Sequence, residues 1–294
     1  MSKLSPTMNR RDLIRSLGAG AALALAGRGI VGAAEGGNVK GRIKQCVTRG
    51  TFSKMPIEEF CKTIKGLGLV GVDLVKDPKE WAVIRDHGLV ASMVPGGGGI
   101  KKGLNDKSMH PQFLEDFKKN IKAAAEFKWP NVIALAGDRE GISDEQSLEN
   151  CALILKEASK MAEDAGVTIC MELLNSKVNH AGYVCDKTAW GVELCRRVNS
   201  ARCKLLYDIY HMQIMEGDII RTINDNIQHI AHFHTAGNPG RKDLDNEQEL
   251  NYPPIMRAIA KLMEEGKFSG YVAHEFSPKR GVESLKQAVE LCDV

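Results

Sequence analysis

Short apolar runs alternate with longer amphipathic runs along most of the chain. The apolar runs have the length of buried strands, whereas the amphipathic runs repeat apolar residues every three to four positions, as helices packed on a sheet do. The pattern predicts strands at 42–47, 69–75, 89–95, 131–137, 167–175, 203–212, 230–237 and 270–277. It predicts helices at 56–67, 78–87, 111–127, 143–164, 186–198, 218–226, 253–265 and 282–292.

Eight strands and eight helices in strict alternation predict an α/β fold, a single-domain (β/α)8 TIM barrel. Helix boundaries agree with this reading, because Ser143 precedes Gln146 with capping-box spacing and Gly166 follows the same helix where a C-terminal glycine is common. The rival is an open doubly wound sheet. That fold usually carries a glycine-rich phosphate turn after its first strand, and here the turn reads Thr48-Arg49-Gly50-Thr51. The barrel is therefore favoured.

The first 34 residues form a segment of a different kind. Asn9-Arg10-Arg11-Asp12-Leu13-Ile14 precedes a weakly apolar run rich in glycine and alanine at 17–26, and small residues at 31–34 offer a cleavage site. This resembles a twin-arginine export signal, so residues 1–34 are predicted as a signal peptide and 35–294 as the barrel. The rival is a basic N-terminal tail without a signal. An export signal implies a periplasmic or otherwise exported enzyme.

The leader and the predicted barrel differ in net charge. The chain carries +3 in total, while the leader holds five basic residues and one acidic residue, +5 − 1 = +4, which leaves −1 for the rest. A barrel with this balance has no basic face for nucleic acid. At 43% hydrophobic and 26% charged, its composition is that of a globular domain with a large core.

Eight cysteines are present without any C-x-x-C pair, so a structural zinc site is not expected. Cys46, Cys170 and Cys203 fall in predicted core strands, where cysteine behaves as a small hydrophobe. Most of the eight are expected to be free.

Four predicted strands end in a side chain that binds hard metal ions. These residues are Glu172, Asp208, His234 and Glu275. A single buried Asp could simply cap the following helix, but four such strand ends favour one shared site at the C-terminal mouth of the barrel. Three converging carboxylates repel each other without a cation, and mostly oxygen ligands suit Mn²⁺ or Mg²⁺, with Co²⁺ as a further option. A structural salt-bridge cluster is the alternative.

Neighbouring residues fall on either side of these strands. His232 shares the face of His234 and is expected beside the ligands, whereas His274 faces away from Glu275 and is expected to be buried structure. The run Pro95-Gly96-Gly97-Gly98-Gly99 is expected to form a lid or rim loop, because it lacks the phosphate-loop pattern. The polar stretch 237–252 is expected to be a second loop over the mouth.

Four motifs stand out in the barrel sequence: Glu172-x-x-Asn175, Leu206–Gln213, His232-x-His234-x-Ala236 through Arg241, and Glu249-Leu250-Asn251-Tyr252. Taken together, they resemble the hydroxypyruvate isomerase family of the xylose-isomerase-like barrels, which also include ketose 3-epimerases and inosose dehydratases. The resemblance covers essentially everything after the leader. Hydroxypyruvate isomerases often carry Gln where this chain has His234, and the epimerases usually carry a Glu where it has Val178.

The resemblance implies roles for the matched positions. Glu172, Asp208, His234 and Glu275 would hold the metal, and Glu172 and Glu275 would also be the catalytic proton carriers. His211, Arg241, Asn175 and His232 would form the substrate-binding set. The implied partner is a small sugar or keto acid; no nucleic acid and no membrane span are expected, and assembly of several copies stays open.

The expected activity is metal-dependent isomerisation of a small hydroxy-carbonyl compound through an enediolate, with Glu residues moving the proton. A sugar 3-epimerase and an inosose-type dehydratase are the alternatives on the same site. A metal-dependent endonuclease would need more histidine ligands and a basic groove. A sugar-binding protein would show two lobes and an aromatic-lined cleft, whereas this chain is only 5% aromatic.

Overall fold

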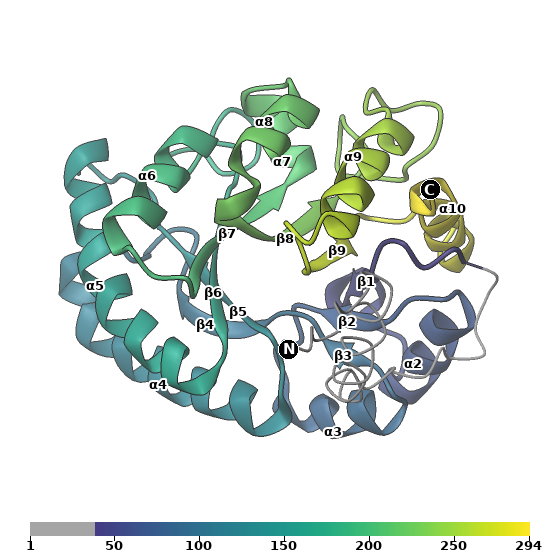
Figure 1. Cartoon of the computed structure of the whole chain (residues 1–294), viewed down its shortest axis with the longest axis horizontal. Helices are drawn as coiled ribbons and strands as arrows, with labels where there is room; N and C mark the ends of the chain where they lie inside the picture. The colour runs from purple at the N-terminus through teal and green to yellow at the C-terminus, as the bar shows by residue number, and fades with distance from the viewer. Residues whose placement is uncertain (1–38) are drawn as a thin grey trace, which may run out of the picture. The chain divides into compact units, whose positions relative to one another are not determined.

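The computed structural model describes residues 39–294, which form one barrel with parallel strands inside and helices outside (Figure 1). The predicted signal peptide at 1–34 lies outside the described residues, so export stays a prediction. Within the described part of the chain, no helix is both long enough and apolar enough to cross a bilayer.

Every strand pair in the sheet is parallel, and the order is β3-β2-β1-β9-β8-β7-β6-β5-β4. The strands are β1 Gln45–Thr48, β2 Gly71–Asp73, β3 Val90–Ala91, β4 Val94–Gly98, β5 Asn131–Leu135, β6 Thr168–Glu172, β7 Cys203–Asp208, β8 Ile230–Thr235 and β9 Tyr271–His274. Parallel strands joined in this order by helices confirm the predicted barrel.

The third predicted strand is divided into β3 and β4 by Ser92 and Met93. These two residues still bridge the neighbouring strands, because the Val75 N–H donates to the Met93 carbonyl at 3.2 Å and Asn131 Nδ2 donates to the Ser92 carbonyl at 2.8 Å. The two segments therefore share one of the eight positions around the barrel.

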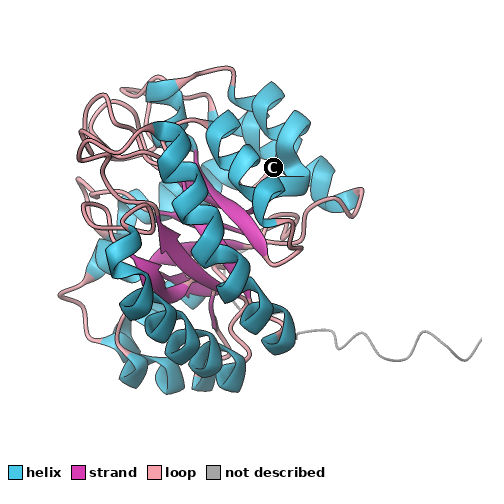
Figure 2. Ribbon diagram, turned by 90° about the vertical axis from the view of Figure 1, so that its left-hand side faces the viewer, coloured by secondary structure: helices cyan, strands magenta, loops and turns pink. Residues whose placement is uncertain are grey.

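Nine α-helices and three short 3-10 helices lie within residues 39–294. The α-helices are α2 Ile57–Gly66, α3 Pro78–Asp86, α4 His110–Phe127, α5 Asp144–Ala165, α6 Thr188–Val198, α7 Ile209–Met215, α8 Ile219–Asn226, α9 Tyr252–Glu264 and α10 Val282–Cys292. The 3-10 helices are η1 Arg49–Phe52, η2 Lys107–Met109 and η3 Ile227–His229. Figure 2 shows the helices lying around the strands.

The predicted strand at 203–212 ends earlier than expected, and its second half is the helix α7. Asp208 is the last strand residue and also the N-cap of α7, since its Oδ1 accepts the N–H of His211 at 3.0 Å. A buried apolar run cannot by itself distinguish strand from helix, and Ile209-Tyr210-His211-Met212 is such a run. The Asp208 carboxylate thus caps α7 with Oδ1 and faces the candidate site with Oδ2.

The glycine run at 95–99 is largely part of strand β4, so the expectation of a lid or rim loop is wrong. A side chain at Gly96 would collide with the Ile133 carbonyl of β5, and a Cβ at Gly97 would lie 2.6 Å from the Phe117 ring of α4. Glycine is needed here because backbone and helix approach closely, not because the segment bends freely.

An apolar floor closes the barrel below the strand ends. Met93, Cys170 and Leu206 form a small buried cluster separate from the main core. Cys170 and Leu206 lie two positions before Glu172 and Asp208, so they share the inward face of their strands with those carboxylates. His232, paired with Leu206 between β7 and β8, lies beside this cluster, so the base of the site is part apolar and part polar. All eight cysteines are buried and free, in line with the prediction for most of them.

Candidate active site

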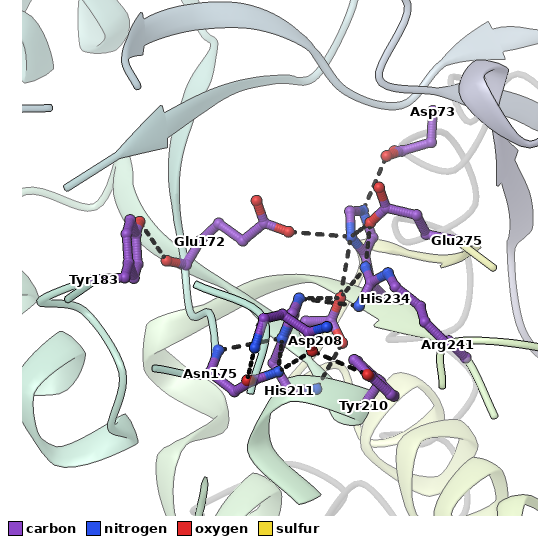
Figure 3. A network of polar contacts seen from close by, with 12 residues as sticks. Asp73, Glu172, Asn175, Tyr183, Asp208, Tyr210, His211, His234, Arg241 and Glu275 are labelled. Carbon is purple, nitrogen blue, oxygen red and sulfur yellow. Dashed lines mark hydrogen bonds and ion pairs between the residues drawn. The ribbon is translucent and has the colours of Figure 1, made fainter. Parts of the chain in front are cut away.

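The four predicted ligands come together at the C-terminal ends of neighbouring strands. Glu172 ends β6, Asp208 ends β7, His234 lies near the end of β8, and Glu275 directly follows β9. Each offers a ligand atom within 4.8 Å of the others, and their side chains converge in Figure 3. Parallel strands in one barrel deliver their last residues to one mouth, and this explains why residues a hundred positions apart meet.

Nδ1 of His234 is the centre of this cluster. It lies 2.8 Å from Glu275 Oε2, 3.4 Å from Glu172 Oε1 and 3.6 Å from Asp208 Oδ2. None of these contacts has hydrogen-bond geometry, and within residues 39–294 this buried nitrogen has no hydrogen-bond partner. A ring nitrogen left unpaired among three carboxylate oxygens is the donor set of a cation site.

Asp73 lies behind His234, and sequence reasoning missed it. Its Oδ1 lies 3.0 Å from His234 Nε2, while its Oδ2 lies 2.9 Å from His232 Nε2 and accepts the Ser92 hydroxyl at 2.6 Å. A carboxylate on the far nitrogen of a histidine keeps the proton there and leaves Nδ1 free to bind metal. The available signal was a fifth apolar strand, Gly71–Asp73, that also ends in a carboxylate.

Burial and neighbouring charges shift the pKa values of the residues in the cluster. Burial opposes charge on Asp73, but His232 and His234 outweigh it and hold the pKa of that carboxyl below its usual value. Burial raises the pKa of Glu172. Burial also opposes charge on Glu275, yet Arg241 and His234 hold its pKa below the usual value. Burial also opposes charge on His234, but Glu275 and the other carboxylates outweigh this effect and raise the pKa of the imidazole.

These residues fit a hard divalent cation. The donor set is three carboxylates and one imidazole, the geometry gathers them around one unpaired nitrogen, and a fourth carboxylate, that of Asp73, orients the ring. Oxygen-rich sets of this kind suit Mg²⁺ or Mn²⁺ better than metals that prefer thiolate. The carboxylates also draw positive charge toward His234 Nδ1, as the raised pKa of this imidazole indicates.

Arg241 reaches the cluster from the loop after β8. Its Nη2 donates to Asp208 Oδ2 at 2.7 Å and to Glu275 Oε2 at 2.6 Å, and its guanidinium lies 5.0 Å from the centre of the Tyr210 ring. Its Nη1 lies 2.9 Å from His211 Nε2. The long polar loop at 237–252 thus places a cation over the site, and Arg241 takes a left-handed backbone conformation (φ 54°) to do so.

The other residues assigned to substrate lie at different depths. His211 is buried beside Arg241, and burial lowers the pKa of its imidazole to about 3. Asn175 lies behind His211 and contacts its ring. His232 is fully buried at Asp73, which is a supporting position beside the ligands rather than one at the mouth. His274 bonds Thr235 and Gln45 and is buried structure, as expected.

A hollow of about 470 Å³ opens beside Glu275 and Arg241, and the hydroxyl-bearing residues Thr48, Thr51 and Ser277 also line it. Glu275 is the one ligand with a partly exposed side chain, at 28%, compared with 8% for Glu172. The hollow is large enough for a small polar molecule whose reacting atoms meet Glu275.

A model of the family described as xylose isomerase-like TIM barrel matches residues 73–293, which is more than half of the chain. The chain belongs to this family. The match begins at Asp73, the residue that orients His234, and includes all four predicted ligands.

Three of the curated proteins that are similar in sequence to this chain carry isomerase names. A 2-oxo-tetronate isomerase of Cupriavidus necator is 33% identical over 46% of this chain and 48% of its own length. One from Pectobacterium atrosepticum is 25% identical over 78% of this chain and 89% of its own. Hydroxypyruvate isomerase of Escherichia coli is 28% identical over 49% of this chain and 54% of its own. The chain thus spans only about half of two of these relatives.

Solved structures agree on the barrel. An AP endonuclease, family 2, from Brucella melitensis superposes with a TM-score of 0.72 at 25% identity, covering 82% of this chain and 96% of its own. D-Psicose 3-epimerase from Clostridium cellulolyticum H10 gives 0.68 at 17% identity, covering 85% and 96%. The second likeness shows the fold alone.

Proposed function

We propose that this protein is a metal-dependent isomerase of a small hydroxy-carbonyl compound, a 2-keto acid of the hydroxypyruvate or 2-oxo-tetronate kind or a ketose. The observation that carries the proposal is the approach of Glu172 and Glu275 to His234 Nδ1 from different strands, at 3.4 Å and 2.8 Å (Figure 3). The names of the curated relatives support the substrate class.

Glu172, Asp208, His234 and Glu275 would hold the ion. A divalent cation bound there supplies Lewis-acid polarisation of the carbonyl and lowers the barrier to removing the neighbouring carbon-bound proton. Asp73 holds His234 with its Nδ1 toward the other three ligands. Met93, Cys170 and Leu206 below the site are fully buried, and a site closed to water on that side strengthens its electrostatic contacts.

The two glutamates divide the proton transfer between them. One Glu carboxylate takes the proton from carbon, which leaves an enediolate, and the other Glu gives a proton to the neighbouring carbon. The proton of the substrate hydroxyl passes to the former carbonyl oxygen, so that the hydroxyl becomes the new carbonyl and the isomerisation is complete. Glu275 suits the role of base, because Arg241 favours its ionised form and its side chain borders the hollow. Glu172 lies deeper and suits the role of the acid that gives a proton to the neighbouring carbon. Arg241 also neutralises negative charge that develops on the substrate oxygen.

Epimerisation and dehydration start with the same proton removal and are separated by their products. Purified protein loaded with Mn²⁺ or Mg²⁺ should be offered hydroxypyruvate, 2-oxo-tetronate, free ketoses and inososes in D₂O. Isomerisation gives an aldose–ketose pair or its keto-acid counterpart with deuterium on carbon. An epimer with unchanged carbonyl position assigns epimerase activity instead, and loss of water assigns dehydratase activity. No deuterium exchange with any of them would contradict the proposal.

A further inference from the structure

The side-chain amide of Asn175 has only one orientation that fits its surroundings. Its Oδ1 accepts the backbone N–H groups of Val178 at 3.0 Å and of Asn179 at 2.9 Å. A backbone N–H can only donate, so the branch that faces these two groups must be the oxygen. The other branch is therefore the NH₂ group, which donates to Asn179 Oδ1 at 2.7 Å.

Asn175 presents two donors to one nitrogen of His211. Its backbone N–H lies 3.1 Å from His211 Nδ1, and its Nδ2 lies 2.6 Å from the same atom (Figure 3). Nδ1 must supply a lone pair to both, so it carries no hydrogen, and a neutral imidazole then has its hydrogen on Nε2.

The contact from Arg241 favours the opposite tautomer of His211, with hydrogen on Nδ1. Its Nη1 lies 2.9 Å from His211 Nε2 and would donate to a lone pair there. Arg241 keeps its bonds to Asp208 and Glu275 without that contact. The buried N–H of Asn175 has no other acceptor among residues 39–294, so protonating Nδ1 would leave it unpaired. The balance favours hydrogen on Nε2.

We propose that Asn175 is a positioning residue that holds His211 as the neutral tautomer with hydrogen on Nε2. His211 then serves as a hydrogen-bond donor and not as a proton acceptor. With hydrogen on Nε2, His211 Nε2 and Arg241 Nη1 are both donors and lie 2.9 Å apart, so an acceptor oxygen placed beside both atoms would satisfy the two of them. Assigning that oxygen to the reacting substrate rests on the proposed function, whereas the tautomer itself does not.

The tautomer can be measured on the full protein without any substrate. Protein labelled with ¹⁵N-histidine is studied at neutral pH by long-range ¹H–¹⁵N correlation, both metal-free and with Mg²⁺, and the His211 signals are assigned by their loss in His211→Gln. We expect a protonated Nε2 and an unprotonated Nδ1. Hydrogen on Nδ1, or on both nitrogens, would overturn the inference. A failed isomerase assay would instead overturn the proposed function and leave this result untouched.

Asn175→Asp tests whether Asn175 selects the tautomer. The carboxylate keeps the contacts to the backbone N–H groups of Val178 and Asn179 and loses the donation to Asn179 Oδ1. It offers His211 Nδ1 an acceptor, and a charge-assisted bond there outweighs the remaining backbone contact. The hydrogen should move to Nδ1, and kcat should fall by about 10²-fold, as for loss of one oxyanion donor, with less effect on KM. Asn179→Asp is the control, because it adds the same charge but presents no oxygen to the ring.

A double variant separates tautomer selection from a general structural effect. In His211→Ala no imidazole remains whose tautomer could change, so adding Asn175→Asp should lower kcat far less than it does in the wild-type background. An equal loss in both backgrounds would mean that Asn175 acts only through the fold. An unchanged His211 tautomer in folded Asn175→Asp would also overturn the role assigned to Asn175.

Discussion

Asp73 Oδ1 lies 3.0 Å from Nε2 of His234, although 161 positions separate the two residues in the chain. The contact turns the other ring nitrogen toward Glu172, Asp208 and Glu275. Asp73 thereby determines which atom of His234 faces the site, and the neighbouring His232 and Ser92 hold Asp73 in place. The candidate metal site accordingly consists of two layers, the four predicted ligands and the residues that orient their imidazole.

Asp73→Asn should weaken metal binding while the fold survives. Asn keeps the size of the side chain but removes the charge that favours hydrogen on Nε2, so affinity for Mn²⁺ should fall by about 10–100-fold. Isothermal titration with Mn²⁺ measures this. Ser92→Ala removes a hydroxyl that contacts Asp73 and the Val72 carbonyl but leaves the Asp73 carboxylate in place, so it should have the smaller effect. Equal affinity in wild type and Asp73→Asn would exclude the orienting role.

Asp208→Asn should also act through metal affinity, for a different reason. Asn retains an oxygen that can accept the His211 N–H, so the cap of α7 persists. The charge at the other oxygen is lost, and the rate should recover in part when metal is added in excess. Activity measured over a series of Mn²⁺ concentrations tests this. A rate that stays equally low at every concentration would point to a role other than metal binding.

Most of the barrel and the four ligands could be predicted because both depend on local pattern. Apolar runs predict the strands, and a parallel barrel brings their C-terminal ends to one mouth, so Glu172, Asp208, His234 and Glu275 follow from strand ends alone. Asp73 carries the same signal, but its strand is short and the apolar residues Leu74 and Val75 follow it, which hides the strand end in the sequence. His232 could be placed beside the ligands, yet its partner could not be named without Asp73.

Contacts between distant segments account for the remaining differences. The glycines after Pro95 are part of a strand because Ile133 and Phe117 approach it closely, and nothing local in the glycine run reveals those neighbours. The helix α7 replaces the end of a predicted strand because Asp208 caps it. The direction in which Asn175 points depends on Val178, Asn179 and His211 together.

Gly96→Ala should destabilise the protein. The added Cβ would collide with the Ile133 carbonyl, which belongs to strand β5 and cannot move aside, so the loss should be at least ~2 kcal/mol. Gly66→Ala is the matched control, because that exposed glycine ends α2 with open space around it and alanine there should be neutral or slightly stabilising. Thermal unfolding of both variants gives the comparison; equal midpoints would contradict the tight packing of β4.

We further propose that the leader is read as a twin-arginine signal and that the barrel works outside the cytoplasm. Replacing Arg10 and Arg11 by Lys should then leave the protein in the cytoplasm with its leader uncut. Cell fractionation followed by mass determination measures both. A chain starting at Glu35 should keep full activity, since the leader supplies no site residue; normal export of the double-Lys variant would refute the signal.

Glu275→Gln tests the central claim, that a metal-binding glutamate also moves the substrate proton. Gln keeps the size and one oxygen for the metal but loses the basic oxygen. The variant should fold and bind Mn²⁺, although more weakly. Exchange of the carbon-bound hydrogen of the substrate with solvent should fall by at least ~10²-fold, the usual contribution of a positioned acid or base.

The decisive measurement is deuterium incorporation into the substrate by wild type and Glu275→Gln, each with its metal content determined in the same sample. The account predicts rapid incorporation by metal-loaded wild type, little without metal, and little by Glu275→Gln even when its site is filled. Near-normal incorporation by folded, metal-loaded Glu275→Gln would contradict it.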